Sequence, residues 1–229
     1  MQTQNSKNII QIAGIIDEAE ARMVLDAGAT HLGFPFRLDF NQEDLTEDQA
    51  AQIIKNLQIQ EKSVLITYLD KSDEIIGLAD FLDCKTVQLH GPISLQELEK
   101  LRNDAPLLGI WKSLVIKKDN ADELTQLVTL IENLADAFIT DTFNPETGAS
   151  GATGKTHDWQ VSQKITTVSK KPVIIAGGLN PENVFDAIIQ IRPSGVDVHT
   201  GVENASGRKD ETKVKAFVEE AKRGFLMIR

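Results

Sequence analysis

The sequence from Pro172 to Gly201, PVIIAGGLNPENVFDAIIQIRPSGVDVHTG, decides the fold. Its two short apolar runs, 172–176 and 195–199, have the composition of parallel strands that are covered on both faces. Between these runs, apolar residues recur at the spacing of one helix face, at Val184, Ala187, Ile188 and Ile191. A strand, a helix and a second strand in this order predict a βαβ unit and a parallel sheet.

The same unit recurs in both directions along the chain. Six further strands are predicted, at 8–12, 30–34, 63–68, 85–89, 107–112 and 137–140. Eight strand–helix pairs in about 220 residues match the usual size of a closed (βα)8 barrel. An open, doubly wound sheet also alternates in this way and is the alternative. We therefore expect a single (βα)8 TIM barrel domain over residues 1–229, with residues 1–7 as a polar N-terminal extension.

Capping patterns mark where three of the predicted helices begin. The pairs Asp17 and Glu20, Thr46 and Gln49, and more weakly Asn180 and Asn183 have capping-box spacing. They place the loops that follow the strands. In a (βα)8 barrel the active site lies at the carboxyl ends of the strands and in these loops, so the residues just after each strand are the candidates for chemistry.

Composition restricts the location and the partners. The net charge of -10 disfavours a nucleic-acid surface or an anionic membrane, and no apolar run approaches the roughly 20 residues that span a bilayer. A single cysteine, Cys84, cannot form an internal disulfide, and no leader-like segment opens the chain, so we expect a cytoplasmic protein. The four histidines stand on separate loops, so we expect neither a metal nor another cofactor. Composition leaves the oligomeric state open.

Three loops rich in small residues predict a phosphate site. The first, GATGKT at 151–156, allows backbone N–H groups to approach an anion and supplies the charge of Lys155. It is not a Walker A loop, because Ala149 stands where that motif needs its first glycine. A glycine-rich linker is the alternative for this segment alone.

The other two loops follow the predicted strands at 172–176 and 195–199. Loops at these positions form the usual phosphate site of the barrel, and a short helix at 201–204 would direct its N-terminus at the anion. Tight turns and helix ends are the alternative reason for these glycines. The sequence predicts a sugar phosphate ligand that is bound by Gly154, Lys155, Gly177, Gly178, Thr200 and Gly201.

Five motifs together resemble the phosphoribosylanthranilate isomerase family of tryptophan biosynthesis. They are VQLHG at 87–91, Asp141-Thr142, GATGKTHDW at 151–159, AGGLNPENV at 176–184 and VDVHTGVE at 196–203. The resemblance implies an aldose–ketose isomerase, which converts N-(5-phosphoribosyl)anthranilate to an aminoketose by an Amadori rearrangement. It also implies substrate contacts from Gln88 and His90.

The family chemistry needs an acid that protonates the ring oxygen and a base that takes the C2 proton. Asp141 fits the acid. The cysteine base of the family falls on Ala13, which has no proton acceptor, and the usual lysine two residues earlier is Gln11. His199 is a candidate for a replacement base or for a phosphate contact, with a structural role as the alternative.

Two further residues have alternative interpretations. The arginine loop that binds the anthranilate carboxylate in the family has become 37–42, where Arg37 either substitutes or is an ordinary exposed arginine. Lys112, at the end of the predicted strand 107–112, is a candidate for a Schiff base or for a positioning role. The altered base and arginine loop leave two alternatives to the isomerase: a diverged barrel enzyme with another sugar phosphate (an isomerase, epimerase or aldolase type), or a non-catalytic protein that binds a phosphate ligand.

Overall fold

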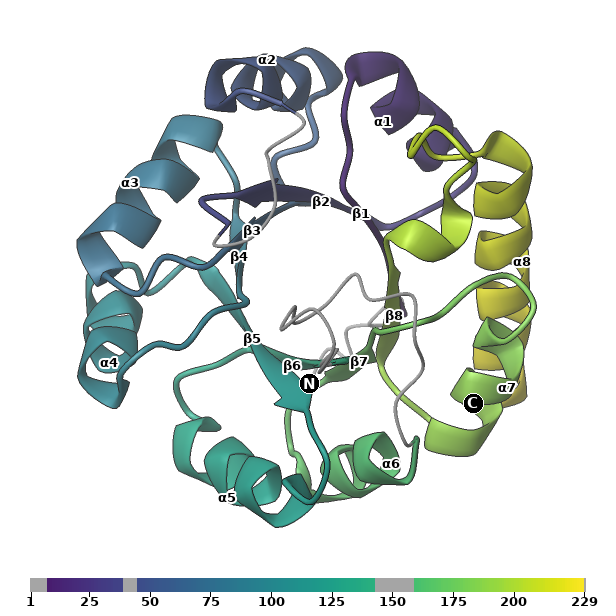
Figure 1. Cartoon of the computed structure of the whole chain (residues 1–229). Coiled ribbons are helices and arrows are strands. Elements are labelled where there is room, and N and C mark those ends of the chain that lie inside the picture. The colour runs from purple at the N-terminus through teal and green to yellow at the C-terminus, as the bar shows by residue number, and fades with distance from the viewer. Residues whose placement is uncertain (1–7, 39–44, 143–158, 229) are drawn as a thin grey trace, which may run out of the picture.

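The computed structural model describes residues 8–38, 45–142 and 159–228, and it is a closed parallel barrel. Each strand pairs with the next along the chain, and β1 pairs with β8 to close the ring. Figure 1 looks down this barrel, with the helices arranged around the outside. The predicted (βα)8 fold is confirmed, and the open doubly wound sheet is wrong.

The elements alternate from end to end. The strands are β1 Ile9–Ala13, β2 His31–Phe36, β3 Ser63–Thr67, β4 Thr86–Leu89, β5 Gly109–Ile116, β6 Ala137–Thr142, β7 Val173–Ile175 and β8 Gly195–Val198. The helices are α1 Glu18–Asp26, α2 Glu47–Leu57, α3 Ser72–Leu82, α4 Leu95–Asp104, α5 Ala121–Ile131, α6 Trp159–Val168, α7 Val184–Ile191, the 3-10 turn η1 Thr200–Val202 and α8 Glu211–Met227.

The largest difference from the predicted strands is the length of β5. It runs to Ile116, four residues beyond the predicted end, because β6 also continues to Thr142 and the two strands stay paired from Trp111↔Ala137 to Ile116↔Thr142. The prediction that Lys112 closes the strand is therefore wrong, since Lys112 lies inside it. Asp141 is the penultimate residue of β6.

Two apolar clusters follow from the alternation of side chains along each strand. The larger one fills the layer between the strands and the helices. The smaller one lies inside the barrel and contains Ala13, Val64, Ile66, Trp111, Ala137, Ile139, Ile174 and Ala176. Polar side chains share the interior positions toward the strand ends, and these build the site described below.

The predicted helix starts are partly as expected. Thr46 and Gln49 form a complete capping box at α2. Asn180 and Asn183 exchange side-chain-to-backbone bonds of the same kind, but α7 begins only at Val184. At α1, the side chain of Asp17 caps the Glu20 N–H as predicted.

Glu20 itself joins the first unit of the barrel to the last. Its Oε2 accepts the N–H of Ile16 at 3.0 Å, and its Oε1 accepts the N–H of Lys209 at 2.7 Å. The carboxylate is buried, and both of its oxygens are bonded to backbone. Glu20 therefore ties the segment after β1 to the segment before α8.

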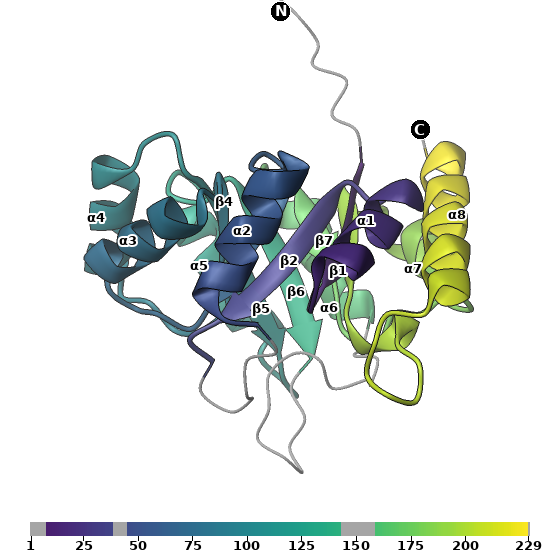
Figure 2. The same ribbon diagram turned by 90° about the horizontal axis from the view of Figure 1, so that it is seen from above.

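The two ends of the barrel differ. Figure 2 shows the β6 arrow pointing to one end, while α8 finishes at the opposite end. Among the described helices, none is both long enough and apolar enough to cross a membrane.

Candidate active site

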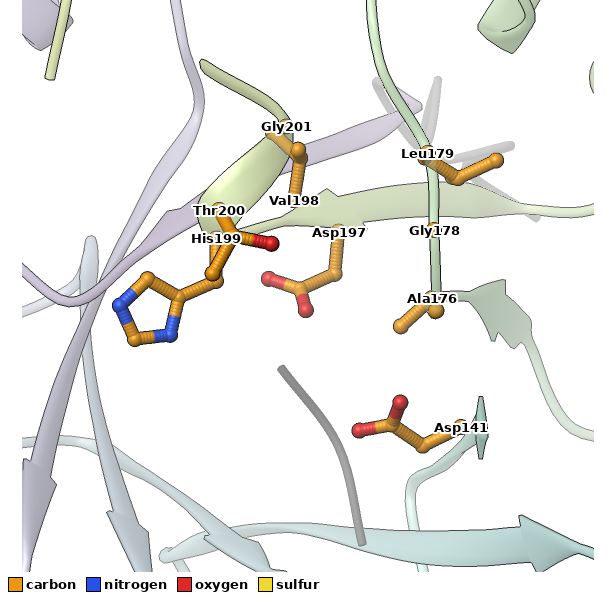
Figure 3. Close-up of a pocket in the computed structure, with 10 residues that line it drawn as sticks. Asp141, Ala176, Gly178, Leu179, Asp197, Val198, His199, Thr200 and Gly201 are labelled. Carbon is orange, nitrogen blue, oxygen red and sulfur yellow. The ribbon is translucent and has the colours of Figure 1, made fainter. Parts of the chain in front are cut away.

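A polar pocket lies at the carboxyl ends of β6, β7 and β8. Its lining comes from Asp141 on β6, from residues 176–179 after β7 and from residues 197–201 at the end of β8. Figure 3 shows the carboxylates of Asp141 and Asp197 pointing into this space, with the His199 ring beside them. The structure thus brings together Asp141, His199, Gly177, Gly178, Thr200 and Gly201, which the sequence singled out from three separate segments.

The turn after β7 depends on two consecutive glycines. Gly177 and Gly178 have φ values of 90° and 66°, in the left-handed region that other residues rarely adopt. A Cβ at Gly177 would overlap the hydroxyl of Thr142, and Asn183 donates to the Gly178 carbonyl at 2.9 Å. The turn is therefore fixed in shape and brings its backbone to the surface of the pocket.

The loop after β8 differs from the expected helix. A short helix does follow β8, but it is only the single 3-10 turn η1 from Thr200 to Val202, and it ends before Glu203. Glu203 is already extended and makes an antiparallel bridge with Lys209. Gly201 packs so closely on the Leu179 carbonyl that any Cβ would overlap it. An anion here would meet the backbone of a tight loop rather than the end of a long helix.

Asp141 is a buried carboxyl with a raised pKa. Burial raises its pKa to about 7. The hydrogen bond at 2.7 Å that its Oδ1 accepts from the backbone N–H of Thr142 lowers the pKa, but by less than burial raises it. The Nδ1 atom of His90 lies 3.9 Å from Oδ2. A carboxyl with this pKa can hold a proton near neutral pH and release it to a substrate oxygen.

A chain of buried polar side chains supports His90 from inside the barrel. The His90 Nδ1 lies 3.2 Å from the Ser113 hydroxyl, and Gln88 donates to the same oxygen at 3.3 Å. Gln11 in turn donates to Gln88 at 3.0 Å. The Tyr68 ring meets His90 edge-on, with 4.9 Å between the ring centroids. These contacts hold His90 beside Asp141, and Gln88 is linked to His90 through the Ser113 hydroxyl.

Sequence reasoning missed Asp197. Burial raises its pKa to about 7, and the Asp141 carboxylate adds to the rise. Its Oδ1 has no hydrogen-bond partner among the residues that the structure describes. The available signal was an acidic residue at an inward position of the otherwise apolar strand GVDV.

His199 lies at the rim of the pocket, at the junction of β8 and β1. Its ring lies against Gly14, at the position where a Cβ would stand, and its Nε2 is 3.3 Å from the Glu203 carboxylate. Burial and the nearby Lys209 ammonium lower the pKa of His199 to about 3, which keeps the ring neutral. Lys209 bonds to Glu203 at 2.7 Å and to the His199 carbonyl at 3.2 Å.

Lys112 and Cys84 lie outside the pocket. The Lys112 ammonium donates to the carbonyls of Leu89, Gly91 and Ser113 at 2.9–3.0 Å, and burial lowers its pKa to about 8. These three bonds use all of its donors, which favours the positioning role over a Schiff base. Burial raises the pKa of the Cys84 thiol to about 12, so it is an inert core residue.

Arg37 is not among the residues that line this pocket. It follows β2, pairs with Glu47 at 2.7 Å and lines a separate cavity between α2 and α3, with Leu78 and Phe81. Its side chain is 57% exposed. A contact between Arg37 and the anthranilate carboxylate stays a prediction, and the predicted Gly154 and Lys155 lie outside the described residues. Within the described ranges, no group of three or more metal-ligating side chains occurs.

The buried Asp197 should make stability depend on pH in a definite direction. Its folded-state pKa of about 7 exceeds the ordinary value of 3.8, so the folded protein holds a proton that the unfolded chain has lost between about pH 4 and 7. Relative to Asp197→Asn, the parent should lose roughly 1–3 kcal/mol of unfolding free energy over this range. Urea unfolding at several pH values measures the difference, and the histidines, present in both proteins, cancel from it. A difference that is constant from pH 4 to 8 would contradict the raised pKa.

Comparisons with known proteins identify the family of this chain. The model of the N-(5'-phosphoribosyl)anthranilate (PRA) isomerase family matches residues 10–220. The isomerase of Methanothrix thermoacetophila is 35% identical over 91% of this chain and 95% of its own, and isomerase 2 of Methanosarcina mazei is 35% identical over 96% of each. The solved isomerase of Thermotoga maritima superposes with a TM-score of 0.78 at 27% identity, covering 95% of this chain and 100% of its own. This chain therefore belongs to the N-(5'-phosphoribosyl)anthranilate isomerase family.

Proposed function

We propose that this protein catalyses the Amadori rearrangement of N-(5'-phosphoribosyl)anthranilate to 1-(o-carboxyphenylamino)-1-deoxyribulose 5-phosphate. The observation that carries the proposal is the buried Asp141 carboxyl, with a pKa of about 7, in one pocket with the two glycine loops. A solved isomerase that shares the fold, with a TM-score of 0.76, is in complex with the reduced form of this product. A cytoplasmic site of action belongs to the same proposal.

Asp141 acts as the acid in the first step. Its proton passes to the ring oxygen, the bond between C1 and that oxygen breaks, and the anthranilate nitrogen supplies the electron pair that forms a C1=N Schiff base. Burial keeps Asp141 protonated near neutral pH, and the adjacent Thr142 N–H stabilises the carboxylate after the transfer. His90, 3.9 Å from Asp141, orients the carboxyl or contacts the substrate hydroxyls.

The phosphate binds to the backbone of the two glycine loops. Gly177 and Gly178 on one side and Thr200 and Gly201 on the other line the same pocket. Gly154 and Lys155 complete this proposed site by their sequence, and Gln88 supports it from within the barrel. His199, beside Thr200, contacts the phosphate or the sugar from the rim.

Turnover of N-(5'-phosphoribosyl)anthranilate tests the proposal directly. The fluorescent substrate is consumed on isomerisation, so the purified chain should accelerate the loss of its fluorescence far above the uncatalysed rate. The substrate also hydrolyses, so the ketose product is quantified in parallel. A purified, folded chain that forms no ketose above background would exclude this activity.

A second candidate, an enzyme for another sugar phosphate, is favoured by one observation. Arg37 is paired with Glu47 in a separate cavity, so no arginine of the described chain lines the pocket beside Asp141. Competition distinguishes the two functions. If this protein is the isomerase, simple pentose phosphates should compete only weakly with the anthranilate substrate for binding. Strong competition by a pentose phosphate would favour the second candidate.

A further inference from the structure

Asp197 has no role in the mechanism described so far, although it lies inside the pocket. It stands on β8 opposite Gln11 of β1, and only 8% of the residue is exposed. Figure 3 shows its carboxylate pointing into the same space as that of Asp141, from across the pocket. Its Oδ1 accepts no hydrogen bond from residues 8–38, 45–142 or 159–228.

The neighbours of Asp197 do not neutralise it. The nearby cation, Lys209, is bonded to Glu203 at 2.7 Å and to the His199 carbonyl at 3.2 Å. Gln11 offers only a neutral amide, which also donates to Gln88. A buried carboxylate without an ion pair destabilises the fold, so a structural role does not explain it.

Glu20 shows what a structural carboxylate looks like in this protein. It is also buried, but each of its oxygens accepts a backbone N–H, from Ile16 and from Lys209. Asp197 has one oxygen that accepts no hydrogen bond from the described residues, and its carboxylate points into the pocket. An unsatisfied acceptor of this kind is typical of a group that waits for a ligand or a proton.

The other candidates for a base are less suited. Ala13 ends β1 with its methyl group in the apolar cluster of the barrel interior and has no lone pair. The His199 ring is held at the rim by the Glu203 carboxylate, 3.3 Å from its Nε2, and burial and the Lys209 ammonium lower its pKa to about 3, which makes it a weak base. Asp197 lines the pocket, and its Oδ1 accepts no hydrogen bond from the described residues.

We propose that Asp197 is the proton acceptor for C2 in this chain, on the side of the pocket across from Asp141, a role that rests on the isomerase function proposed above. After ring opening, the C2 proton passes to the free oxygen of Asp197. The C2–H electron pair forms a C1=C2 bond, and the C1=N pair returns to the nitrogen. Loss of the 2-hydroxyl proton and protonation of C1 then give the ketose, with no atoms gained or lost overall.

The pair of carboxyls suits this division of roles. Among the described residues, the charged and titratable groups around Asp197 are Asp141 on β6, Lys209 before α8, and His199 directly after β8. Burial raises the pKa of both carboxyls, and the Asp141 carboxylate raises that of Asp197 further, so the two groups titrate as a coupled pair near neutral pH. The ionised member accepts from C2, and the protonated member donates to the ring oxygen.

Kinetics of Asp197→Asn test this role. We expect kcat to fall by about 10²–10⁴-fold, while the reduced product analogue binds within about threefold of the parent. The rising limb of the kcat–pH profile, which reports ionisation of the base, should disappear. Formate should restore part of the rate to Asp197→Ala by replacing the missing carboxylate. Asp186→Asn, a change to an exposed aspartate on α7, is the matched control and should leave kcat unchanged.

Two results would overturn the proposal. One is an Asp197→Asn variant within about tenfold of the parent kcat that keeps the rising limb. The other comes from His199→Gln, which does not depend on the folding of any Asp197 variant: loss of the rising limb there would assign the base to the imidazole. If the parent protein is active and either result is found, only the role of Asp197 is rejected. If the parent protein itself forms no ketose, the isomerase function is rejected as well.

Discussion

Asp141→Asn is expected to lower kcat for N-(5'-phosphoribosyl)anthranilate by about 10²–10⁴-fold. The amide has nearly the same shape but cannot give a proton to the ring oxygen, so ring opening loses its acid. Its Oδ1 can still accept the Thr142 N–H that now bonds to Asp141 at 2.7 Å, so the end of β6 should keep its geometry. Steady-state kinetics, with product quantification, measure the effect.

A binding measurement distinguishes loss of the catalytic acid from disruption of the pocket structure. The Asp141→Asn variant should bind the reduced product analogue within about threefold of the parent, because the carboxyl acts on the reaction rather than on the phosphate. Asp104→Asn, at the exposed end of α4, is a control that should leave both quantities unchanged. If Asp141→Asn retained more than about a tenth of the parent kcat, another group would have to be the acid.

Gly201→Ala is expected to lower kcat/KM by about 10²-fold, mainly through phosphate binding. The added methyl would overlap the Leu179 carbonyl, so the loop after β7 and the loop after β8 must move apart. Both loops line the pocket, and their backbone is the proposed phosphate contact. Overpacking at this site should also cost about 1–3 kcal/mol of unfolding free energy.

A second glycine provides the control. Gly77 lies in α3, and a Cβ there would meet nothing within 4 Å. Gly77→Ala should therefore stabilise the protein by about 0.5–1 kcal/mol and leave kcat/KM at the parent value. Inorganic phosphate, as a competitive inhibitor, tests the cause: its inhibition constant should rise in Gly201→Ala. An unchanged inhibition constant would mean that the phosphate binds elsewhere.

The barrel could be predicted because its strands are short, apolar and separated by helical periodicity. Strand ends were less certain, since the run Leu114–Ile116 is equally compatible with a loop until its pairing with β6 is known. The short helix expected after β8 forms only as η1 and ends at Val202, because Glu203 is used in a bridge to Lys209, a contact that depends on residues outside the motif.

The site was predictable where function depends on backbone shape. Glycines in consecutive βα loops predicted the pocket that we propose for the phosphate, because the fold brings those loops together. Asp197 was missed because its significance lies in an oxygen that accepts no hydrogen bond from the described residues, which its place in the strand GVDV alone does not reveal. Arg37 could not be placed, because its partner Glu47 became evident only from the arrangement of β2 and α2.

The bonds of Glu20 have a consequence for how the chain folds during synthesis. Glu20 belongs to the first helix, yet one of its oxygens is satisfied only by the N–H of Lys209, 189 positions later in the chain. A chain that has not yet reached Lys209 holds a carboxylate that cannot be buried without penalty. Folding of the first unit is thereby coupled to the last, a contact of very high sequence separation. The pocket residues on β8 consequently become ordered late, after most of the barrel has been synthesised.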